Sequence, residues 1–475
     1  MSATTIYWHD YETFGADPVR DRPSQFAGQR TDEELNAVGE PLVLFCRPPV
    51  DRLPSPEACL ITGITPQIAR ERGDIEARFI AGILEQLFMP GTCGTGYNSL
   101  RFDDEVTRHT LFRNFHDPYA REWRDGCSRW DIIDLTRMTA ALRPEGIRWP
   151  SKPDGNPSFR LADLAAANGL EHAEAHDALS DVQATIALAR LLRDRQPRLY
   201  RWLFDLRHKR KVAELVDIPA GTPLVHTARV HPAANCCTSL VLPLVYETRN
   251  RNSVLVYDLR MDPAPFLDLP PEELHQRLYT PVAELGDSAM RLPVHSVKIN
   301  RCPALAPAAT LDDATQTRTG LDLAACARHR ERIRDHADFA RKVEQAVASR
   351  DFPAAGDVDE SLYGGFLNDH DRNLCRRIVS ASPAELAAGG HDFHDERLPE
   401  LLFRYRARNW PDSLDALERE QWQAHCEDRY HDECTGLEPY FERLAELRLE
   451  VGDDPSGVRV LDALEDWADI LLAAA

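Results

Sequence analysis

The sequence IYWHDYETFG, residues Ile6–Gly15, decides the fold of this chain. Its apolar, β-branched and aromatic start is typical of a buried strand. Because side chains alternate across a strand, we expect Asp10 and Glu12 to project side by side from one face. Two such carboxylates raise each other's pKa unless a cation lies between them, and Mg²⁺ or Mn²⁺ prefers oxygen ligands. The pair therefore indicates a divalent metal site, although a solvated strand tip carries the same pattern.

Length and composition indicate an ordinary globular protein with more than one domain. Its 475 residues exceed what one core holds, and 43% are hydrophobic and 28% charged. The sequence has no apolar run of transmembrane length. Acidic residues begin at Asp10, where a signal peptide would have its hydrophobic segment, so we expect no signal peptide. The eleven cysteines include no C-x-x-C pair, which indicates reduced thiols. We therefore expect a cytoplasmic protein that does not bind membranes.

Charge is distributed unevenly along the chain. The net charge of −21 argues against a protein coated in nucleic acid. Residues 1–194 carry −9, residues 195–352 carry +4, and residues 353–475 carry −16. The middle segment is thus the first candidate for the track of a bound polyanion.

The three segments also differ in their expected secondary structure. The first alternates strand-like and helix-like stretches, which favours an α/β sheet domain: a strand at Leu42–Cys46 and helices at Phe79–Leu87 and Ala178–Leu192. The second contains short β runs at Pro223–Ala228, Ser239–Tyr246 and Ser253–Leu259. The third reads as amphipathic helices at Leu362–Leu367, Leu398–Tyr405, Leu414–Trp422, Leu437–Val451 and Asp462–Leu472.

Two further stretches carry acids at expected helix starts. Asp103 follows a glycine-rich approach, where it is either a metal ligand or simply an N-cap. His176 precedes Asp181 by five residues at the start of a long amphipathic helix. A helix would hold Asp181 rigidly as a ligand, while a histidine on the preceding loop suits a general base that approaches substrate water.

The ordered set D-x-E, F-D and H-x4-D resembles the DEDDh exonuclease superfamily. The resemblance extends to bacterial exonuclease I over nearly the whole chain. It is carried by these stretches: His9–Gly15, Leu60–Pro66, Arg101–Val106, Arg113–Phe115, Asp117–Tyr119, Leu142–Ile147, Pro157–Leu161 and Arg404–Asn409.

The resemblance implies a processive enzyme that degrades single-stranded DNA from its 3′ end to 5′-mononucleotides in DNA repair or recombination. By position, Asp10, Glu12, Asp103 and Asp181 would hold two Mg²⁺ ions, for which Mn²⁺ would substitute, and His176 would be the general base. It also implies that Glu12 and five further side chains contact the DNA strand: Arg160, Arg108, Tyr119, Trp123 and Arg137.

The resemblance further implies an α/β, RNase H-like exonuclease domain over residues 1–194, an SH3-like β domain over 195–352 and an all-helical domain over 353–475. The SH3-like domain would form a basic wall of a DNA channel, and the acidic helical domain would close that channel. The family also suggests a monomer that binds the acidic C-terminal tail of single-stranded DNA-binding protein. Arg404, Arg406 and Arg408 are one possible pocket for that tail.

Several alternatives stay open at this point. Shorter DEDDh exoribonucleases and proofreading exonucleases share the acidic motifs, and a catalytically dead DNA- or protein-binding scaffold belongs to another class. The basic run Arg207–Lys211 is either a solvated face or a phosphate contact. A zinc site formed by His425, Cys426, His431 and Cys434 is disfavoured, because acids crowd the stretch and no C-x-x-C pair is present.

Overall fold

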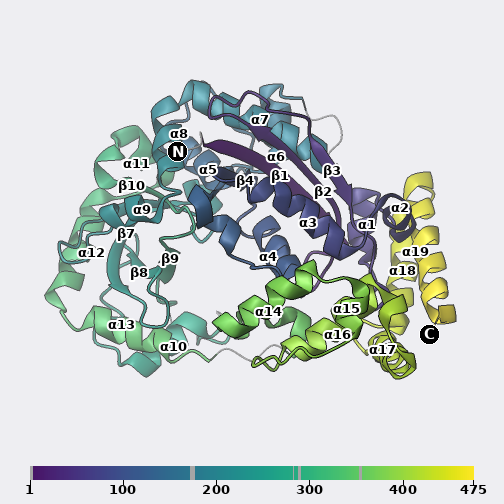
Figure 1. Ribbon diagram of the computed structural model, residues 1–475. Coiled ribbons are helices and arrows are strands. Elements are labelled where there is room, and N and C mark those ends of the chain that lie inside the picture. Colours follow the sequence, from purple (N-terminus) through teal and green to yellow (C-terminus); the bar gives the residue numbers. More distant parts are fainter. Residues whose placement is uncertain (1–3, 172–176, 282, 287–289, 352–355, 475) are drawn as a thin grey trace. The chain divides into compact units, whose positions relative to one another are not determined.

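The computed structural model describes residues 4–171, 177–281, 283–286, 290–351 and 356–474 (Figure 1). Its backbone forms two compact units. Residues 1–128, 173–183 and 354–475 make up the first, and residues 129–172 and 184–353 make up the second. Among the described residues, we find no helix whose length and apolar character would let it cross a membrane.

A mixed β-sheet organises the first unit. Its strands are β1 (Thr5–Thr13), β2 (Pro23–Thr31), β3 (Leu42–Phe45) and β4 (Thr92–Gly96), in the order β3-β2-β1-β4. β1 runs antiparallel to β2 and parallel to β4, so the strand predicted in Ile6–Gly15 is the central one. The strand predicted at Leu42–Cys46 is β3, at the edge of the sheet. Asp10 lies opposite Ala27 and Glu12 opposite Gln25 in the β1–β2 ladder. A fifth strand, β5 (Ser128–Asp131), begins where the first unit ends.

Helices cover one face of this sheet. The aromatic rings of Tyr7 and Tyr11 on β1 join an apolar core with Phe79, Ile83 and other residues of α3 (Glu76–Leu87) and α4 (Asp103–Arg113). Short helices α1 (Pro56–Thr62) and α2 (Pro66–Arg72) precede α3. The alternation along β1 therefore sends its odd-numbered side chains into this core and its even-numbered acids to the opposite face.

The C-terminal helices belong to the same compact unit. They are α14 (Asp369–Ser380), α15 (Pro383–Ala387), α16 (Leu398–Asn409), α17 (Ala416–Tyr430), α18 (Leu437–Val451) and α19 (Pro455–Ala474). Trp422, Leu444 and Leu464 share a core with Cys59 and Ala69, so α17–α19 pack against the region of α1 and α2. Figure 1 shows α18 and α19 beside α1 and α2.

Most helices predicted in the third segment are confirmed, but Leu362–Leu367 is not an α-helix. The chain there forms a 3₁₀ turn, η5 (Val358–Gly364), and then irregular backbone. Gly364 and Gly365 explain the difference, because adjacent glycines disfavour helix continuation.

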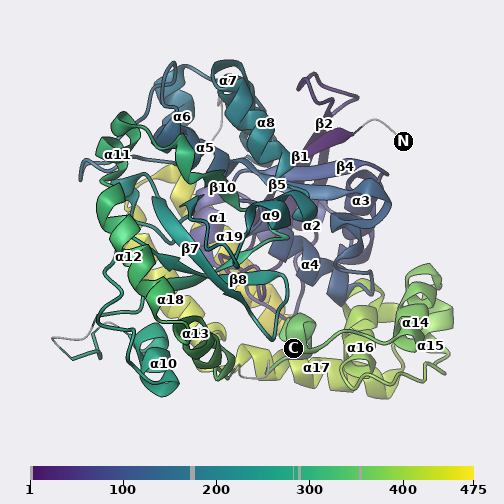
Figure 2. The same ribbon diagram turned by 90° about the vertical axis from the view of Figure 1, so that its left-hand side faces the viewer.

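A second five-stranded sheet lies in the second unit, in the order β10-β6-β7-β8-β9. Its strands, all antiparallel to their neighbours, are β6 (Leu224–Thr227), β7 (Thr238–Tyr246), β8 (Ser253–Asp258), β9 (Val294–Lys298) and β10 (Ala304–Pro307). The three predicted β runs are confirmed as β6, β7 and β8. Figure 2 shows β7 and β8 side by side.

The second unit also contains helices, of which α5 (Ile132–Leu142) and α13 (Phe339–Ala348) contact its sheet. The others are α6 (Leu161–Asn168), α8 (Pro197–Asp205), α9 (Lys209–Leu215), α10 (Pro271–Tyr279), α11 (Asp313–Thr319) and α12 (Leu323–Asp335). α5 contacts β6, β7 and β10, while α13 contacts β7 and α10. The remaining long helix, α7 (Ala178–Arg195), starts in the first unit and continues into the second.

Candidate active site

The structure brings the predicted acids together in the first unit. Carboxylate oxygens of Asp10, Glu12 and Asp181 all lie within 4.8 Å of one another. Asp10 and Glu12 come from the even-numbered face of β1, as the strand alternation predicts, and Asp181 comes from the first turn of α7. Glu12 is only 9% exposed. These three side chains therefore form one compact acidic cluster from segments about 170 residues apart.

Asp103 joins this cluster through β1. The backbone N–H of Tyr11, which lies between the two β1 acids, donates a hydrogen bond to Oδ1 of Asp103 at 2.9 Å. The Thr107 hydroxyl on α4 donates to the backbone oxygen of Asp103 at 2.7 Å, and its oxygen lies 3.1 Å from the Tyr11 hydroxyl. A Cβ on Gly96 would lie 2.7 Å from the backbone oxygen of His9, so only glycine lets the end of β4 lie this close to β1. Asp103 is thus fixed beside the β1 acids.

Asp177 is a further acid at the site that the sequence analysis did not select. Its carboxylate accepts a hydrogen bond from the Ser180 N–H at 3.1 Å and one from Gln25 Nε2 on β2 at 3.4 Å. Asp177 therefore caps α7 and ties its start to the sheet, which sets the position of Asp181. The sequence did carry a signal for this role, because Asp177 stands directly before the predicted helix at Ala178–Leu192. The predicted base, His176, lies outside the described residues.

Crowding of carboxylates raises the pKa values of acids in this cluster. Burial raises the pKa of Asp10 well above its usual range, and the carboxylates of Asp103, Glu12 and Asp181 raise it further. Burial and the charges of Asp181 and Asp103 likewise raise the pKa of Glu12 to about 8. Each repulsion favours protonation or a bound cation.

This donor set fits a hard divalent metal ion. All its side chains offer carboxylate oxygens, which Mg²⁺ and Mn²⁺ prefer over the nitrogen and sulfur ligands of softer ions. The neighbouring acid Asp104 is already matched, because Arg121 donates to it at 2.7 Å in a buried ion pair. The cluster itself carries the charge that a metal would neutralise.

The residues of the first unit that were predicted to contact the DNA strand differ in how exposed they are. The Arg108 guanidinium forms a paired contact with Glu122, at 2.6 and 2.9 Å, and also donates to Glu105 at 2.8 Å. It lies 5.5 Å from the centre of the Tyr119 ring. Trp123, in contrast, is 64% exposed. The Arg108 guanidinium is therefore engaged with its acidic neighbours, whereas the exposed Trp123 ring has the Arg124 guanidinium 5.6 Å from its centre.

Two aromatic residues of the C-terminal segment lie beside Tyr119 and Arg108 and were missed by the sequence analysis. Phe366 is 87% exposed, and its ring lies 5.9 Å from that of Tyr119. Tyr363 is 56% exposed and its hydroxyl accepts a hydrogen bond from Arg108 at 3.1 Å. The run Tyr-Gly-Gly-Phe was a usable signal, because large aromatics beside glycines on a non-helical segment are often exposed.

The remaining predicted contacts lie in the second unit. Arg137 is buried on α5 and donates to Asp134 at 2.7 Å, while Arg160 is exposed at the N-cap of α6. In the basic run, Lys209 donates to Asn252 at 2.5 Å, and Arg210 and Lys211 both pair with Glu214. Most of this run is exposed. The predicted DNA contacts of these residues stay predictions.

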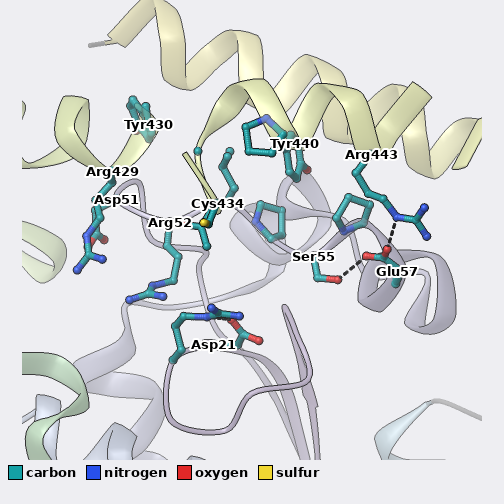
Figure 3. Close-up of a pocket in the computed structure, with 17 residues that line it drawn as sticks. Asp21, Asp51, Arg52, Ser55, Glu57, Arg429, Tyr430, Cys434, Tyr440 and Arg443 are labelled. Carbon is teal, nitrogen blue, oxygen red and sulfur yellow. Dashed lines mark hydrogen bonds and ion pairs between the residues drawn. The ribbon is translucent and has the colours of Figure 1, made fainter. Parts of the chain in front are cut away.

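The arginines proposed for a partner's acidic tail are already paired. Arg404, Arg406 and Arg408 on α16 form ion pairs of 2.6 to 2.8 Å with Asp357, Glu418 and Asp359 respectively. A separate pocket lies between the segment Asp51–Glu57 and helices α17 and α18 (Figure 3). Figure 3 shows Arg443 reaching Glu57, with Ser55 beside it. Arg404, Arg406 and Arg408 are therefore internal ion-pair residues and do not form a tail pocket.

Similarity to known proteins extends over the whole chain. Family models match in three places: "Exonuclease" at residues 7–189, "Exonuclease I SH3-like domain" at 207–349 and "Exonuclease I C-terminal domain" at 356–471. Exodeoxyribonuclease I of Escherichia coli is 45% identical over 98% of both chains. The chain belongs to the exodeoxyribonuclease I family. As such it is a nuclease, and its fold is the predicted combination of an α/β exonuclease domain, an SH3-like domain and a helical C-terminal domain.

Solved structures of exodeoxyribonuclease I agree with this assignment. E. coli exonuclease I in complex with a dA16 oligonucleotide matches with a TM-score of 0.96 and 45% identity, covering 98% of this chain and 100% of that one. A complex of exonuclease I and single-stranded DNA-binding protein with the inhibitor CFAM matches with a TM-score of 0.93 and 43% identity, covering 99% and 100%. The acidic cluster therefore lies in a chain that is similar to these enzymes in fold over 98–99% of its residues.

Proposed function

We propose that this member of the exodeoxyribonuclease I family is a Mg²⁺-dependent 3′→5′ exonuclease that degrades single-stranded DNA processively to 5′-mononucleotides in DNA repair or recombination. The observation that carries the proposal is the cluster of Asp10, Glu12 and Asp181, with Asp103 anchored beside it. The relative bound to a dA16 oligonucleotide supports the choice of single-stranded DNA.

The reaction is hydrolysis of the terminal phosphodiester. A water oxygen forms a bond to phosphorus, the bond from phosphorus to the 3′ oxygen of the preceding nucleotide breaks, and that oxygen takes up a proton. Two divalent ions, when bound, lower the pKa of the attacking water and stabilise charge on the leaving oxygen. Asp10, Glu12, Asp103 and Asp181 would hold these Mg²⁺ ions, and Mn²⁺ would substitute.

The chain's own residues contribute rigidity and proton transfer. Asp10 and Glu12 sit on the central strand of the sheet, Asp103 is fixed by the Tyr11 N–H, and Asp181 is fixed by the helix that Asp177 caps. Such positioning matters because small displacements at a reacting centre are costly in rate. In this proposal His176 accepts the proton of the attacking water.

Exposed aromatic side chains suit binding of a single strand. Phe366 lies next to Tyr119, and Arg108 contacts both Tyr119 and Tyr363; we call these three rings the aromatic surface. Trp123 is exposed on the segment that follows Tyr119. Bases stack on such rings with about 1–3 kcal/mol per base and little sequence preference. Arg160, Arg137 and the partly neutralised Arg108 complete the proposed contacts, with Arg108 chiefly orienting Tyr119 and Tyr363.

Other parts of the proposal rest on family membership. The domains would span residues 1–194, 195–352 and 353–475, and the protein would act as a cytoplasmic monomer. The solved complex that contains single-stranded DNA-binding protein supports that partner here. The α16 arginines are excluded from the binding site for its tail by their internal ion pairs.

The two alternatives are less well supported. A shorter DEDDh exoribonuclease or proofreading exonuclease would not account for matches to the SH3-like and C-terminal models at residues 207–349 and 356–471. A non-catalytic scaffold has no need for four converging carboxylates, and their mutual repulsion would be a cost without a purpose.

The proposal is tested with DNA and RNA strands of equal length, each labelled at the 3′ or the 5′ end. We expect Mg²⁺-dependent release of mononucleotides from DNA 3′ ends, inhibition by EDTA and slow turnover of RNA. Addition of excess unlabelled competitor after the start measures processivity. Release from 5′ ends, preference for RNA, or full activity in EDTA would overturn the proposal.

A further inference from the structure

Three histidines of the second unit converge at a place remote in sequence from the acidic cluster. Nδ1 of His226 lies 3.1 Å from Nε2 of His231 and 3.1 Å from Nε2 of His295. The three ring centres are each 5.1 Å apart. One ring nitrogen from each histidine therefore points toward a common centre.

The sheet brings these residues together from separate strands. His226 lies on β6, His295 on β9, and His231 follows β6 in a turn closed by its N–H bond to Ala228. In the sheet order, β7 and β8 stand between β6 and β9. In a flat sheet that separation is roughly 14 Å. The contact of 3.1 Å between the side chains therefore requires a strongly curled sheet, with both rings on its inner side.

Hydrogen bonding alone does not account for the arrangement. A ring nitrogen holds either one proton or one lone pair in the ring plane. Nδ1 of His226 can thus make only one well-directed N–H···N bond to its two nitrogen neighbours. His226 and His231 are 5% and 4% exposed, so water has little access to relieve the remaining contact. A cation at the common centre would accept a lone pair from all three nitrogens.

The two nitrogen–nitrogen distances from His226 are close to those of tetrahedral zinc. Zinc–nitrogen bonds of 2.0–2.1 Å at a tetrahedral angle place ligand nitrogens roughly 3.3 Å apart. The observed 3.1 Å differs from this by a few tenths of an ångström. Imidazole suits zinc, whereas Mg²⁺ and Ca²⁺ prefer oxygen. Three protein ligands also leave a fourth position for water or another small ligand.

A carboxylate lies behind one of the histidines, as in many zinc sites. Nδ1 of His231 is 3.3 Å from Oδ2 of Asp258. Oδ1 of Asp258 accepts hydrogen bonds from Ser239 Oγ at 2.5 Å and from the Arg260 N–H at 3.0 Å. Asp258 thereby orients the His231 ring so that Nε2 faces the centre, which is the usual role of a carboxylate behind a zinc-bound histidine.

We propose that His226, His231 and His295 form a zinc-binding site in the second unit, with Asp258 as the positioning residue. The site is independent of the proposed nuclease centre, since it uses nitrogen ligands from another part of the chain. Bound zinc would link β6, the turn after it and β9, and so stabilise the curled sheet.

Zinc binding is tested on the full chain carrying Asp10→Asn and Asp181→Asn, because carboxylates of the acidic cluster also attract divalent ions. The protein is stripped with EDTA, dialysed and titrated with ZnCl₂ against a chromophoric chelator. We expect one zinc per chain with micromolar or tighter affinity. His231→Gln or His295→Gln should weaken it at least ~100-fold, and Asp258→Asn ~10–100-fold. His208→Gln, an exposed histidine of the same unit, is the matched control and should change nothing.

Cobalt gives a second measurement that does not depend on mutants. Co²⁺ bound by three imidazoles in a tetrahedral site absorbs strongly in the visible range, whereas Co²⁺ on carboxylates and water is six-coordinate and absorbs weakly. We expect strong absorption that ZnCl₂ abolishes. Circular dichroism of the metal-free variants checks that they fold. The proposal is overturned if no zinc binds below about 100 μM, or if folded His231→Gln and His295→Gln proteins bind it as before.

Discussion

Two groups of buried carboxylates in the first unit respond to burial in opposite ways. In the acidic cluster, the pKa values of Asp10 and Glu12 are raised. Asp51 and Asp359 are each only 1% exposed, yet their pKa values lie well below the usual range. Burial would raise them too, but the guanidinium of Arg408, 2.6 Å from both, outweighs it. We call Asp51 and Asp359 the arginine-paired aspartates.

The difference teaches that neighbours, and not burial, decide what a buried acid does. The arginine-paired aspartates are neutralised by side chains of this chain, since Arg22 and Arg404 also contact Asp359. They connect α16 to the sheet region, and their negative charge is balanced by these arginines without a bound cation. In the acidic cluster the neighbouring carboxylates instead raise the pKa values of Asp10 and Glu12, and in the proposed function a metal ion neutralises them. One group is therefore structural and the other is proposed to be catalytic.

The largest expected effect is on activity. Asp10→Asn removes a metal ligand while keeping the side chain's shape, and we expect a loss of about 10⁴-fold in the rate of mononucleotide release, or about 5 kcal/mol of transition-state stabilisation. The free energy of unfolding of the metal-free protein should not fall, because a repulsive charge is removed. Asp469→Asn, an exposed acid on α19, is the matched control. Activity within tenfold of the parent would contradict the metal assignment.

The second expected effect is on stability. Asp359→Asn leaves the buried arginines Arg22, Arg404 and Arg408 without their shared carboxylate. We expect the free energy of unfolding in urea to fall by about 3–4 kcal/mol. Activity of the protein that remains folded should stay near that of the parent. A change below about 1 kcal/mol would show that the arginine pairs do not stabilise the unit.

A smaller effect is expected at the aromatic surface. Phe366→Ala removes an exposed ring next to Tyr119 and should weaken binding of a short single strand by about 1–2 kcal/mol, or roughly 5–30-fold. Fluorescence anisotropy in EDTA measures this without cleavage. Leu449→Ala, equally exposed on α18, controls for loss of surface area. Equal affinities of the two variants would remove Phe366 from the binding surface.

The last prediction is that the stability of the metal-free protein depends on pH with opposite sign for the two groups. The pKa of Glu12 is about 8 in the folded, metal-free protein, against about 4.3 in an unfolded chain. The folded state keeps its proton longer, so stability falls as pH rises from about 4 to 8. The lowered pKa values of Asp51 and Asp359 instead give stability above about pH 4 that is lost in acid.

Thermal unfolding with and without Mg²⁺ separates these contributions. Because the ion binds ionised carboxylates, it should raise the Tm by a few degrees more at pH 8 than at pH 6. The Asp10→Asn variant should show a smaller difference. An effect of Mg²⁺ that does not vary with pH would contradict the raised pKa of Glu12.

Sequence patterns were sufficient where a feature is local. The alternation in Ile6–Gly15 predicted both the strand and the common face of Asp10 and Glu12, and helix periodicity predicted α3 and α18. The family resemblance supplied the ordered set that includes Asp103 and Asp181. The glycine pair after Tyr363 was underweighted, so a helix was expected where a 3₁₀ turn forms.

Features that depend on long-range contacts could not be predicted in the same way. Arg408 was considered for a partner's tail because the sequence does not show that Asp51 and Asp359 lie against it. Zinc was sought, and disfavoured, at His425, which instead lies 3.5 Å from Asp51. His226 and His295 stand 69 residues apart and meet only because the second sheet curls. No spacing rule connects them.

The central claim, that the acidic cluster is a metal centre, is tested most directly by anomalous diffraction from crystals soaked in MnCl₂. The account predicts Mn²⁺ peaks among the carboxylates of Asp10, Glu12, Asp103 and Asp181, and their loss in crystals of the Asp10→Asn variant. An active enzyme whose soaked crystals hold no Mn²⁺ at these carboxylates, or a variant that keeps the same peaks, would contradict it.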